Sequence, residues 1–123
     1  MREKEIKEFL ESKGYKQWAS KKDNIGDCMF ITEKYQKRVD FDTAWTTAPL
    51  CECNDKLLVN IEVNTNTIGG VENTTWTIFL LHQSPVNDEW CDLKIYNIPT
   101  DKLIDIEKFE SKLREMWIVF NKD

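Results

Sequence analysis

Hydrophobic and polar positions alternate most regularly in the middle of the chain. Every second residue between positions 57 and 65 is apolar, and this period of two predicts a half-buried β-strand. Residues 91–98 alternate in the same way and predict another strand. Residues 75–82 are apolar on both faces, which predicts a central strand with its second face covered. The double glycine at residues 69–70 predicts a turn that leads into this central strand.

Apolar residues at helical spacing mark both ends of the chain. The apolar residues between positions 6 and 10 predict a helix over residues 2–13. Gly14 is expected to end this helix by adopting the left-handed conformation. Thr100 predicts the start of a second helix, and Asp105 is an alternative cap for a later start. The apolar stripe of this second helix consists of Leu103, Ile106, Phe109, Leu113, Trp117 and Phe120.

The first strands are expected between these regions. Residues 15–20 and 28–35 predict a hairpin with a turn signal at residues 23–26. Residues 36–56 are the least regular stretch, with a further strand considered over residues 38–45. The whole predicts one α+β domain over residues 1–123, a single antiparallel four- to five-stranded sheet flanked by an N-terminal and a C-terminal helix. We expect its open face to carry Asn60, Glu62, Asn64, Asp92, Lys94 and Tyr96.

Length and composition indicate a protein with one hydrophobic core. The chain has 123 residues, 41% of them hydrophobic and 32% charged, which is typical of neither disordered nor membrane-embedded proteins. The apolar run at residues 78–81 is far short of the ~20 residues that a membrane helix needs. Because the first residues alternate in charge and form no apolar signal region, we expect a cytoplasmic protein.

The sequence argues against most catalytic chemistry. Its four glycines do not form a phosphate-binding loop, and the single histidine, His82, has no neighbouring pattern of a catalytic base. Cys51 and Cys53 are an alternative zinc pair, with Cys28, Cys91 and His82 as further ligands. Their spacing is unusual for zinc, so we interpret the cysteines as reduced, apolar side chains and expect no metal or cofactor.

A metal-dependent nuclease is the least favoured alternative. Asp40 and Asp42, helped by Glu52 or Asp55, are hard oxygen ligands of the kind that magnesium prefers. A second acidic pattern, Asp92 before Lys94 with Asp88 or Glu62 nearby, resembles a nuclease site on a strand only faintly. Because both patterns are short, we expect a non-enzymatic protein.

Charge is distributed unevenly along the chain. The net charge is −5, but residues 1–38 carry ten basic and seven acidic side chains, whereas residues 39–107 carry three basic and twelve acidic ones. We expect the folded domain to present a negative side, which attracts basic proteins and argues against direct binding of nucleic acid. The alternative is that the acidic surface only keeps the protein soluble.

This charge distribution suggests an inhibitor that binds a basic nucleic-acid-processing protein, such as a nuclease. Small acidic anti-CRISPR proteins from phages and toxin-neutralising immunity proteins have this general character. Trp45 and Trp90 stand beside acidic residues, where a tryptophan acts as an interface anchor or as a lid on the core. The predicted partner-binding residues are Asp40, Asp42, Trp45, Asp88, Glu89, Trp90 and Asp92.

The alternative binding function uses the basic N-terminal hairpin. Six basic side chains and one tryptophan surround it, a combination typical of nucleic-acid-binding surfaces. The residues of this alternative site are Lys16, Trp18, Lys21, Lys22, Lys34, Lys37 and Arg38.

Overall fold

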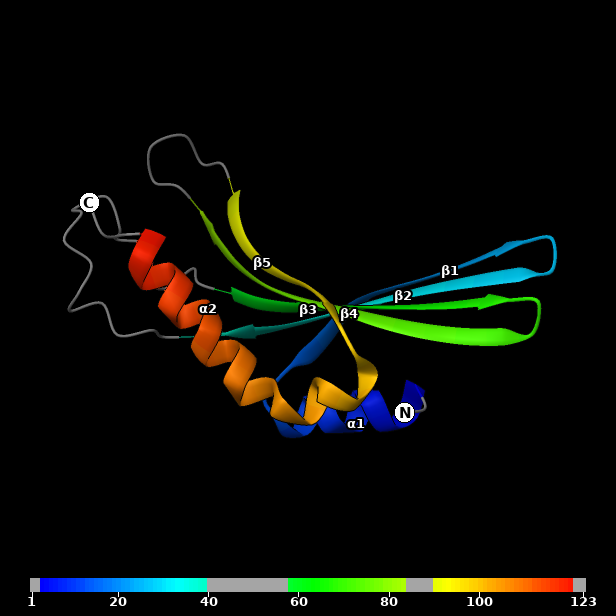
Figure 1. Ribbon diagram of the computed structural model, residues 1–123, viewed down its shortest axis with the longest axis horizontal. Helices are drawn as coiled ribbons and strands as arrows, with labels where there is room; N and C mark the ends of the chain where they lie inside the picture. Colours follow the sequence, from blue (N-terminus) through cyan, green and yellow to red (C-terminus); the bar gives the residue numbers. More distant parts are fainter. Residues whose placement is uncertain (1–2, 40–57, 84–89, 121–123) are drawn as a thin grey trace.

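The computed structural model describes residues 3–39, 58–83 and 90–120 of the chain. Its elements confirm the predicted α+β fold: one antiparallel sheet of five strands in the order β1-β2-β3-β4-β5, with one N-terminal and one C-terminal helix (Figure 1). The elements are α1 (Glu3–Ser12), β1 (Lys16–Ile25), β2 (Cys28–Arg38), β3 (Leu58–Ile68), β4 (Val71–Gln83), β5 (Trp90–Ile98), the 3-10 helix η2 (Thr100–Asp105) and α2 (Ile106–Phe120).

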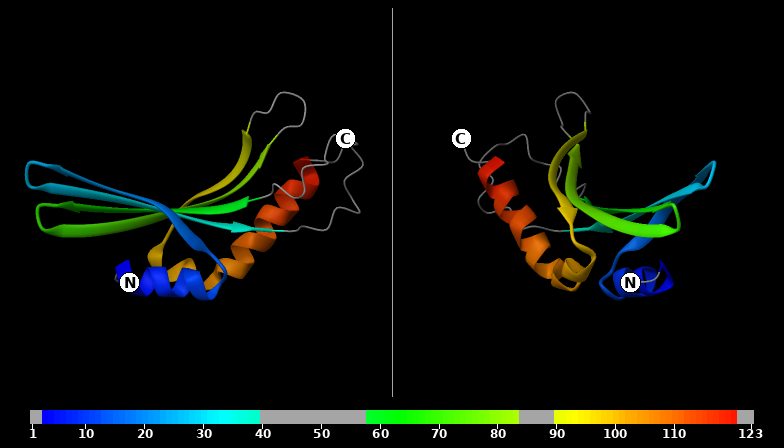
Figure 2. Two further views of the ribbon diagram at one scale, coloured as in Figure 1. Left: turned by 180° about the vertical axis from the view of Figure 1, so that it is seen from behind. Right: turned by 45° about the vertical axis from the view of Figure 1, so that its right-hand side comes forward.

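Both helices lie on the same side of the sheet in all three views (Figures 1 and 2). The sheet face beneath them is apolar because the alternate residues of β3 and β4 that face the helices are aliphatic or aromatic. Val63 pairs with Trp76 and Ile61 pairs with Ile78, and all four side chains are buried. The helices cover this face, and the buried residues of α1 and α2 are Ile6, Leu10, Ile106, Leu113 and Trp117. The same core includes Tyr15, Tyr35 and Ile98.

The end of α1 follows from Gly14, as the sequence predicts. The Tyr15 amide donates to the Leu10 carbonyl and the Gly14 amide donates to the Glu11 carbonyl, each at 3.0 Å. Gly14 has φ +92°, so these two bonds form a Schellman motif around a left-handed residue. Leu10 and Tyr15 are both buried, which turns the chain from the helix directly into the core.

The first hairpin turns later than the sequence signal predicts. β1 continues through residues 23–25, and the two-residue turn is Gly26–Asp27, with Ile25 pairing with Cys28. This part of β1 is exposed, so its sequence has no alternating apolar residues. The polar residues 23 and 24 therefore gave the signal of a turn although they belong to the strand. At residues 69–70 the predicted turn is confirmed, with positive φ at both glycines.

The C-terminal helix begins in two stages. Residues 100–105 form a 3-10 helix, and the α-helix starts at Ile106 directly after Asp105, the later of the two predicted starts. Ile106, Leu113 and Trp117 recur at helical spacing and are buried, which confirms this part of the predicted stripe. Within the described part of the chain, neither helix has the length and apolar character needed to cross a membrane.

The two hairpins extend well beyond the helices. In Figure 1 the β1–β2 and β3–β4 turns project side by side to the right of α1, where no helix covers either face of the sheet. Their last row of side chains is apolar and runs across all four strands. Ile25, Ile68 and Val71 in this row are more than half exposed, and Cys28 is partly buried.

Candidate functional site

The sheet face opposite the helices, called the open face below, carries the candidate site. Its side chains are those that alternate with the buried residues in the strand register. One row across all five strands consists of Lys16, Gln36, Asn60, Phe79 and Lys94. The sequence-based placement of Asn60, Glu62, Asn64, Asp92, Lys94 and Tyr96 on this face agrees with the register.

Basic residues outnumber acidic residues on the described part of the open face. Its five basic residues come from β1, β2 and β5, and its three acidic residues by register are Asp23, Glu62 and Asp92. Most of these cations are solvent-exposed, and one of them, Lys21, pairs with Asp23 at 3.6 Å. The five basic residues are Lys16, Lys21, Lys34, Arg38 and Lys94.

A β-bulge places Trp18 on this face. The pairing passes from Gln17–Tyr35 to Ala19–Lys34, so Trp18 is the extra residue of the bulge. Its ring is 52% exposed, and the Lys34 ammonium lies 5.5 Å from the ring centroid. This is a cation–π pair whose aromatic part remains open to solvent.

A second group of aromatic and basic side chains lies at the other edge of the sheet. The Lys94 ammonium is 5.6 Å from the ring centroid of Phe79 and 5.8 Å from that of Tyr96. Tyr96 is 63% exposed, whereas Phe79 is half-buried. The open face therefore has an exposed aromatic ring beside an ammonium group at each edge, about 15–20 Å apart at ~4.8 Å per strand.

The strand between these edges presents polar, mainly uncharged side chains. On the open face β3 carries Asn60, Glu62, Asn64 and Asn66. The Thr32 hydroxyl donates to Asn64 Oδ1 at 2.9 Å, so the Asn64 amide nitrogen is the donor group of this side chain. Asn60 is buried, so the hydrogen-bonding groups of β3 that a ligand can reach are those of Glu62, Asn64 and Asn66, which cations and rings flank.

Two of the predicted nucleic-acid-binding residues are not part of the open face. Lys22 pairs with Ile31 and lies on the opposite face, one residue along from Lys21. Lys37 also lies on the helix side, where its ammonium contacts Oε1 of Glu110 at 2.5 Å and lies 4.8 Å from the Tyr15 ring. The structure brings the other five together: Lys16, Trp18, Lys21, Lys34 and Arg38.

The predicted acidic partner site lies largely outside the described residues. Asp40, Asp42, Trp45, Asp88 and Glu89 fall there, as do Glu52, Asp55, Cys51 and Cys53 of the alternative metal sites. For the remaining two, the backbone of Trp90 pairs with Gln83 and that of Asp92 with Leu81 at the start of β5.

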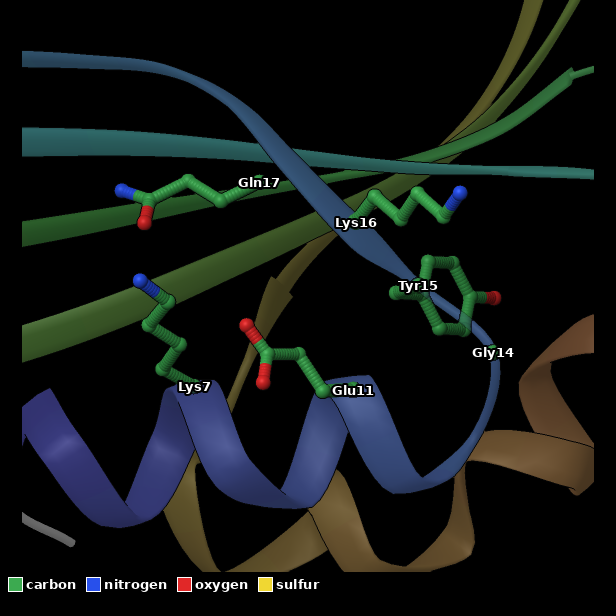
Figure 3. Close-up of a pocket in the computed structure, with 6 residues that line it drawn as sticks. All are labelled: Lys7, Glu11, Gly14, Tyr15, Lys16 and Gln17. Carbon is green, nitrogen blue, oxygen red and sulfur yellow. The ribbon is translucent and has the colours of Figure 1, made fainter.

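The described residues hold no candidate metal centre. Among them, no group of three or more His, Cys, Asp or Glu residues is arranged to hold a metal. A hollow of about 450 Å³ lies between α1 and the start of β1, and Figure 3 shows Lys7 and Glu11 pointing from the helix toward it. Its other lining residues are Gly14, Tyr15, Lys16 and Gln17, and this mixture of side chains has no recognisable catalytic arrangement.

Sequence reasoning missed how the two edges of the open face combine. Lys94 and Tyr96 were expected on this face but not as part of a basic site, because β5 is distant in sequence from β1. Comparison with protein-family models, curated proteins and solved structures found no match for this chain.

Proposed function

We propose that the chain is a non-enzymatic binding domain whose open face binds single-stranded nucleic acid. The observation that carries the proposal is the presence of an exposed ring beside an ammonium group at both edges of one sheet face, Trp18 with Lys34 and Tyr96 with Lys94. Single-stranded nucleic acids bind to surfaces of this composition, because bases stack on aromatic rings while phosphates meet basic side chains.

The overall negative charge does not oppose this proposal, because binding depends on the local field. Among the described residues, the acids of α1 and α2 lie with the helices on the other side of the sheet, away from the five basic residues of the open face. With a Debye length of about 8 Å at physiological ionic strength, charges on the far side of the domain contribute little. Among the described residues, a ligand at the open face therefore meets more basic than acidic side chains.

Fluorescence anisotropy with labelled oligonucleotides tests the proposal. We expect binding to a single strand, weaker binding to a duplex of the same length, and a loss of about fivefold to 100-fold for Trp18→Ala, which removes a stacking platform. Lys21→Ala should weaken binding, whereas Lys22→Ala, on the opposite face of the same strand, is the matched control. Absence of binding, or equal effects of the two lysine variants, would reject the open face as the site.

A second proposal is that the domain binds a basic protein, as an inhibitor of a nucleic-acid-processing enzyme or as an immunity protein. One topological observation favours it. Arg38, Leu58, Leu81 and Asp92 stand in one row across β2–β5. The segments 40–57 and 84–89 therefore start and finish at the same end of the sheet, and with residues 90–92 they contain seven acidic residues and one basic residue.

A salt-dependent pull-down from the native host separates this second proposal from the first. Recovery of one basic protein at low salt, lost after charge reversal at Asp40, Asp42, Asp88 and Glu89, would support it. Nuclease treatment of the lysate provides the control, since a partner held through nucleic acid is lost after digestion. Unchanged recovery with the charge-reversed protein would show that the acidic segments 40–57 and 84–92 are not the interface.

A further inference from the structure

The charges on the open face are sorted by strand. The cations stand on β1, β2 and β5, whereas the described open-face side of β3 carries amides and the Glu62 carboxylate but no basic side chain. Glu62 pairs with Lys34 on one side and with Thr77 on the other, so it lies near the middle of the sheet. Any ligand that spans the two aromatic edges has to cross this carboxylate.

The position of Glu62 restricts how a nucleic acid can lie. A phosphate above it would be repelled, whereas the four cations of β1 and β2 form a basic flank one to two strand spacings (about 4.8 Å each) from β3. Asp23, which pairs with Lys21 at 3.6 Å, limits this flank toward the hairpin turn. A strand whose phosphates follow this flank directs its bases toward β3. The bases then meet the Glu62 carboxylate, which only accepts hydrogen bonds.

We infer that Glu62 is a specificity-determining residue that favours bases with an exocyclic amino group, such as cytosine, over uracil; this inference rests on the proposed function. The cytosine amino group donates directly to a carboxylate. In uracil a carbonyl oxygen replaces that amino group, and the ring N–H lies between two carbonyl oxygens that repel a carboxylate. Asn64, whose Oδ1 is occupied by Thr32, presents a donor to a neighbouring base instead.

The test compares oligodeoxycytidine with oligodeoxyuridine of equal length, because the two pyrimidine rings differ in hydrogen bonding but little in size. The native chain should bind the cytidine oligomer about fivefold to tenfold more tightly at neutral pH. Glu62→Gln, which both donates and accepts, should reduce this ratio to about twofold or less, mainly by improving binding of the uridine oligomer. Glu72→Gln, an exposed carboxylate on the other face, is the matched control and should leave the ratio unchanged.

The outcomes separate the inference from the function on which it rests. If neither oligomer binds the native chain, the open face is not a nucleic-acid site and both proposals fail. If both bind equally, or if Glu62→Gln keeps the native ratio, the nucleic-acid function stands and the role of Glu62 is overturned. Circular dichroism of each variant confirms that it is folded before binding is compared.

Discussion

Lys37 on β2 and Glu110 on α2 form an ion pair with 2.5 Å between Nζ and Oε1, although they are 73 positions apart in sequence. The Tyr15 hydroxyl donates to the same carboxylate oxygen at 2.7 Å. All three side chains are largely shielded from water. This cluster fastens the C-terminal helix to the sheet and explains why Lys37 is unavailable to the open face.

Removal of the shared carboxylate should destabilise the fold. Glu110→Ala leaves the Lys37 ammonium and the Tyr15 hydroxyl without this acceptor, and we expect the free energy of unfolding to fall by about 1–3 kcal/mol. Urea denaturation measures the change. Glu107→Ala, which breaks the more exposed 3.3 Å pair with Lys13, is the control and should cost less than about 0.5 kcal/mol. Equal losses in the two variants would show that Glu110 has no special role.

Stability should fall at high pH through Tyr15. Burial, followed by the hydrogen bond to Glu110 and its negative charge, raises the pKa of Tyr15 above its ordinary value of 10.0. The unfolded chain loses this proton near pH 10 while the folded chain keeps it, so unfolding is favoured by about 1.4 kcal/mol for each further pH unit. Tyr15→Phe should make the free energy of unfolding fall less steeply with pH above pH 10, by about 1.4 kcal/mol per pH unit. Urea denaturation at a series of pH values measures this slope. An unchanged slope would place the effect on another group.

Gly14 should tolerate substitution less well than a turn glycine. Both Gly14 and Gly26 have positive φ, but a Cβ on Gly14 would lie 3.2 Å from Cδ of Lys37, whereas a Cβ on Gly26 would meet nothing within 4 Å. We expect Gly14→Ala to cost about 1–2 kcal/mol and Gly26→Ala about 1 kcal/mol or less. Thermal unfolding of the two variants checks the order, and the reverse order would contradict the packing at the end of α1.

Binding at the open face should depend on salt in proportion to its cations. For single strands the slope of log K against log salt is about −0.7 for each phosphate contacted, so five cations limit it to about −3.5. Lys21→Ala should reduce the steepness by about 0.7, and Lys22→Ala should leave it unchanged. Affinities measured over a range of potassium chloride concentrations provide the slope. A slope near zero would show that phosphates do not contact this face.

Asn60 should be replaceable by an apolar residue with a gain in stability. It is 1% exposed, its Nδ2 donates to the Leu58 carbonyl at 3.3 Å, and its Oδ1 has no hydrogen-bond partner among the described residues. Because a buried, unpaired acceptor is costly, Asn60→Val should raise the free energy of unfolding by about 1 kcal/mol. Asn66→Val, on the same face but less buried, is the control and should change the free energy of unfolding little. A lower stability for Asn60→Val would show that the polar group of Asn60 is needed.

Much of the fold was predictable from local sequence patterns. The alternation before residue 65, the helical stripes and Gly14 each indicate structure within a few neighbouring residues. The structure agrees with the strand, with Gly14 and with the stripe of α2 at Ile106, Leu113 and Trp117. The first turn was predicted wrongly because residues 23–26 lie where both sheet faces are exposed, so burial imposed no apolar period there.

The candidate site was less predictable because it depends on pairing between distant segments. A period of two places Lys21 and Lys22 on opposite faces, so strand geometry alone separates these neighbours. The ion pair between Lys37 and Glu110 has no local sequence signal, because Glu110 belongs to a helix that follows much later in the chain. The bulge at Trp18 has none either, because it depends on the register between β1 and β2. The acidic residues 40–42 and 88–89 remain predictions outside the described part of the chain.

The two hairpin ends that extend beyond the helices should open more easily than the rest of the sheet. Their amides are held by ladder hydrogen bonds and by side-chain contacts such as Thr32 with Asn64, without a helix packed above them. Local opening therefore costs less free energy there than around the buried Ile61 and Ile78. Deuterium should enter the sheet in a gradient, first at the turns and last beneath the helices, so that one continuous sheet contains a rigid half and a yielding half.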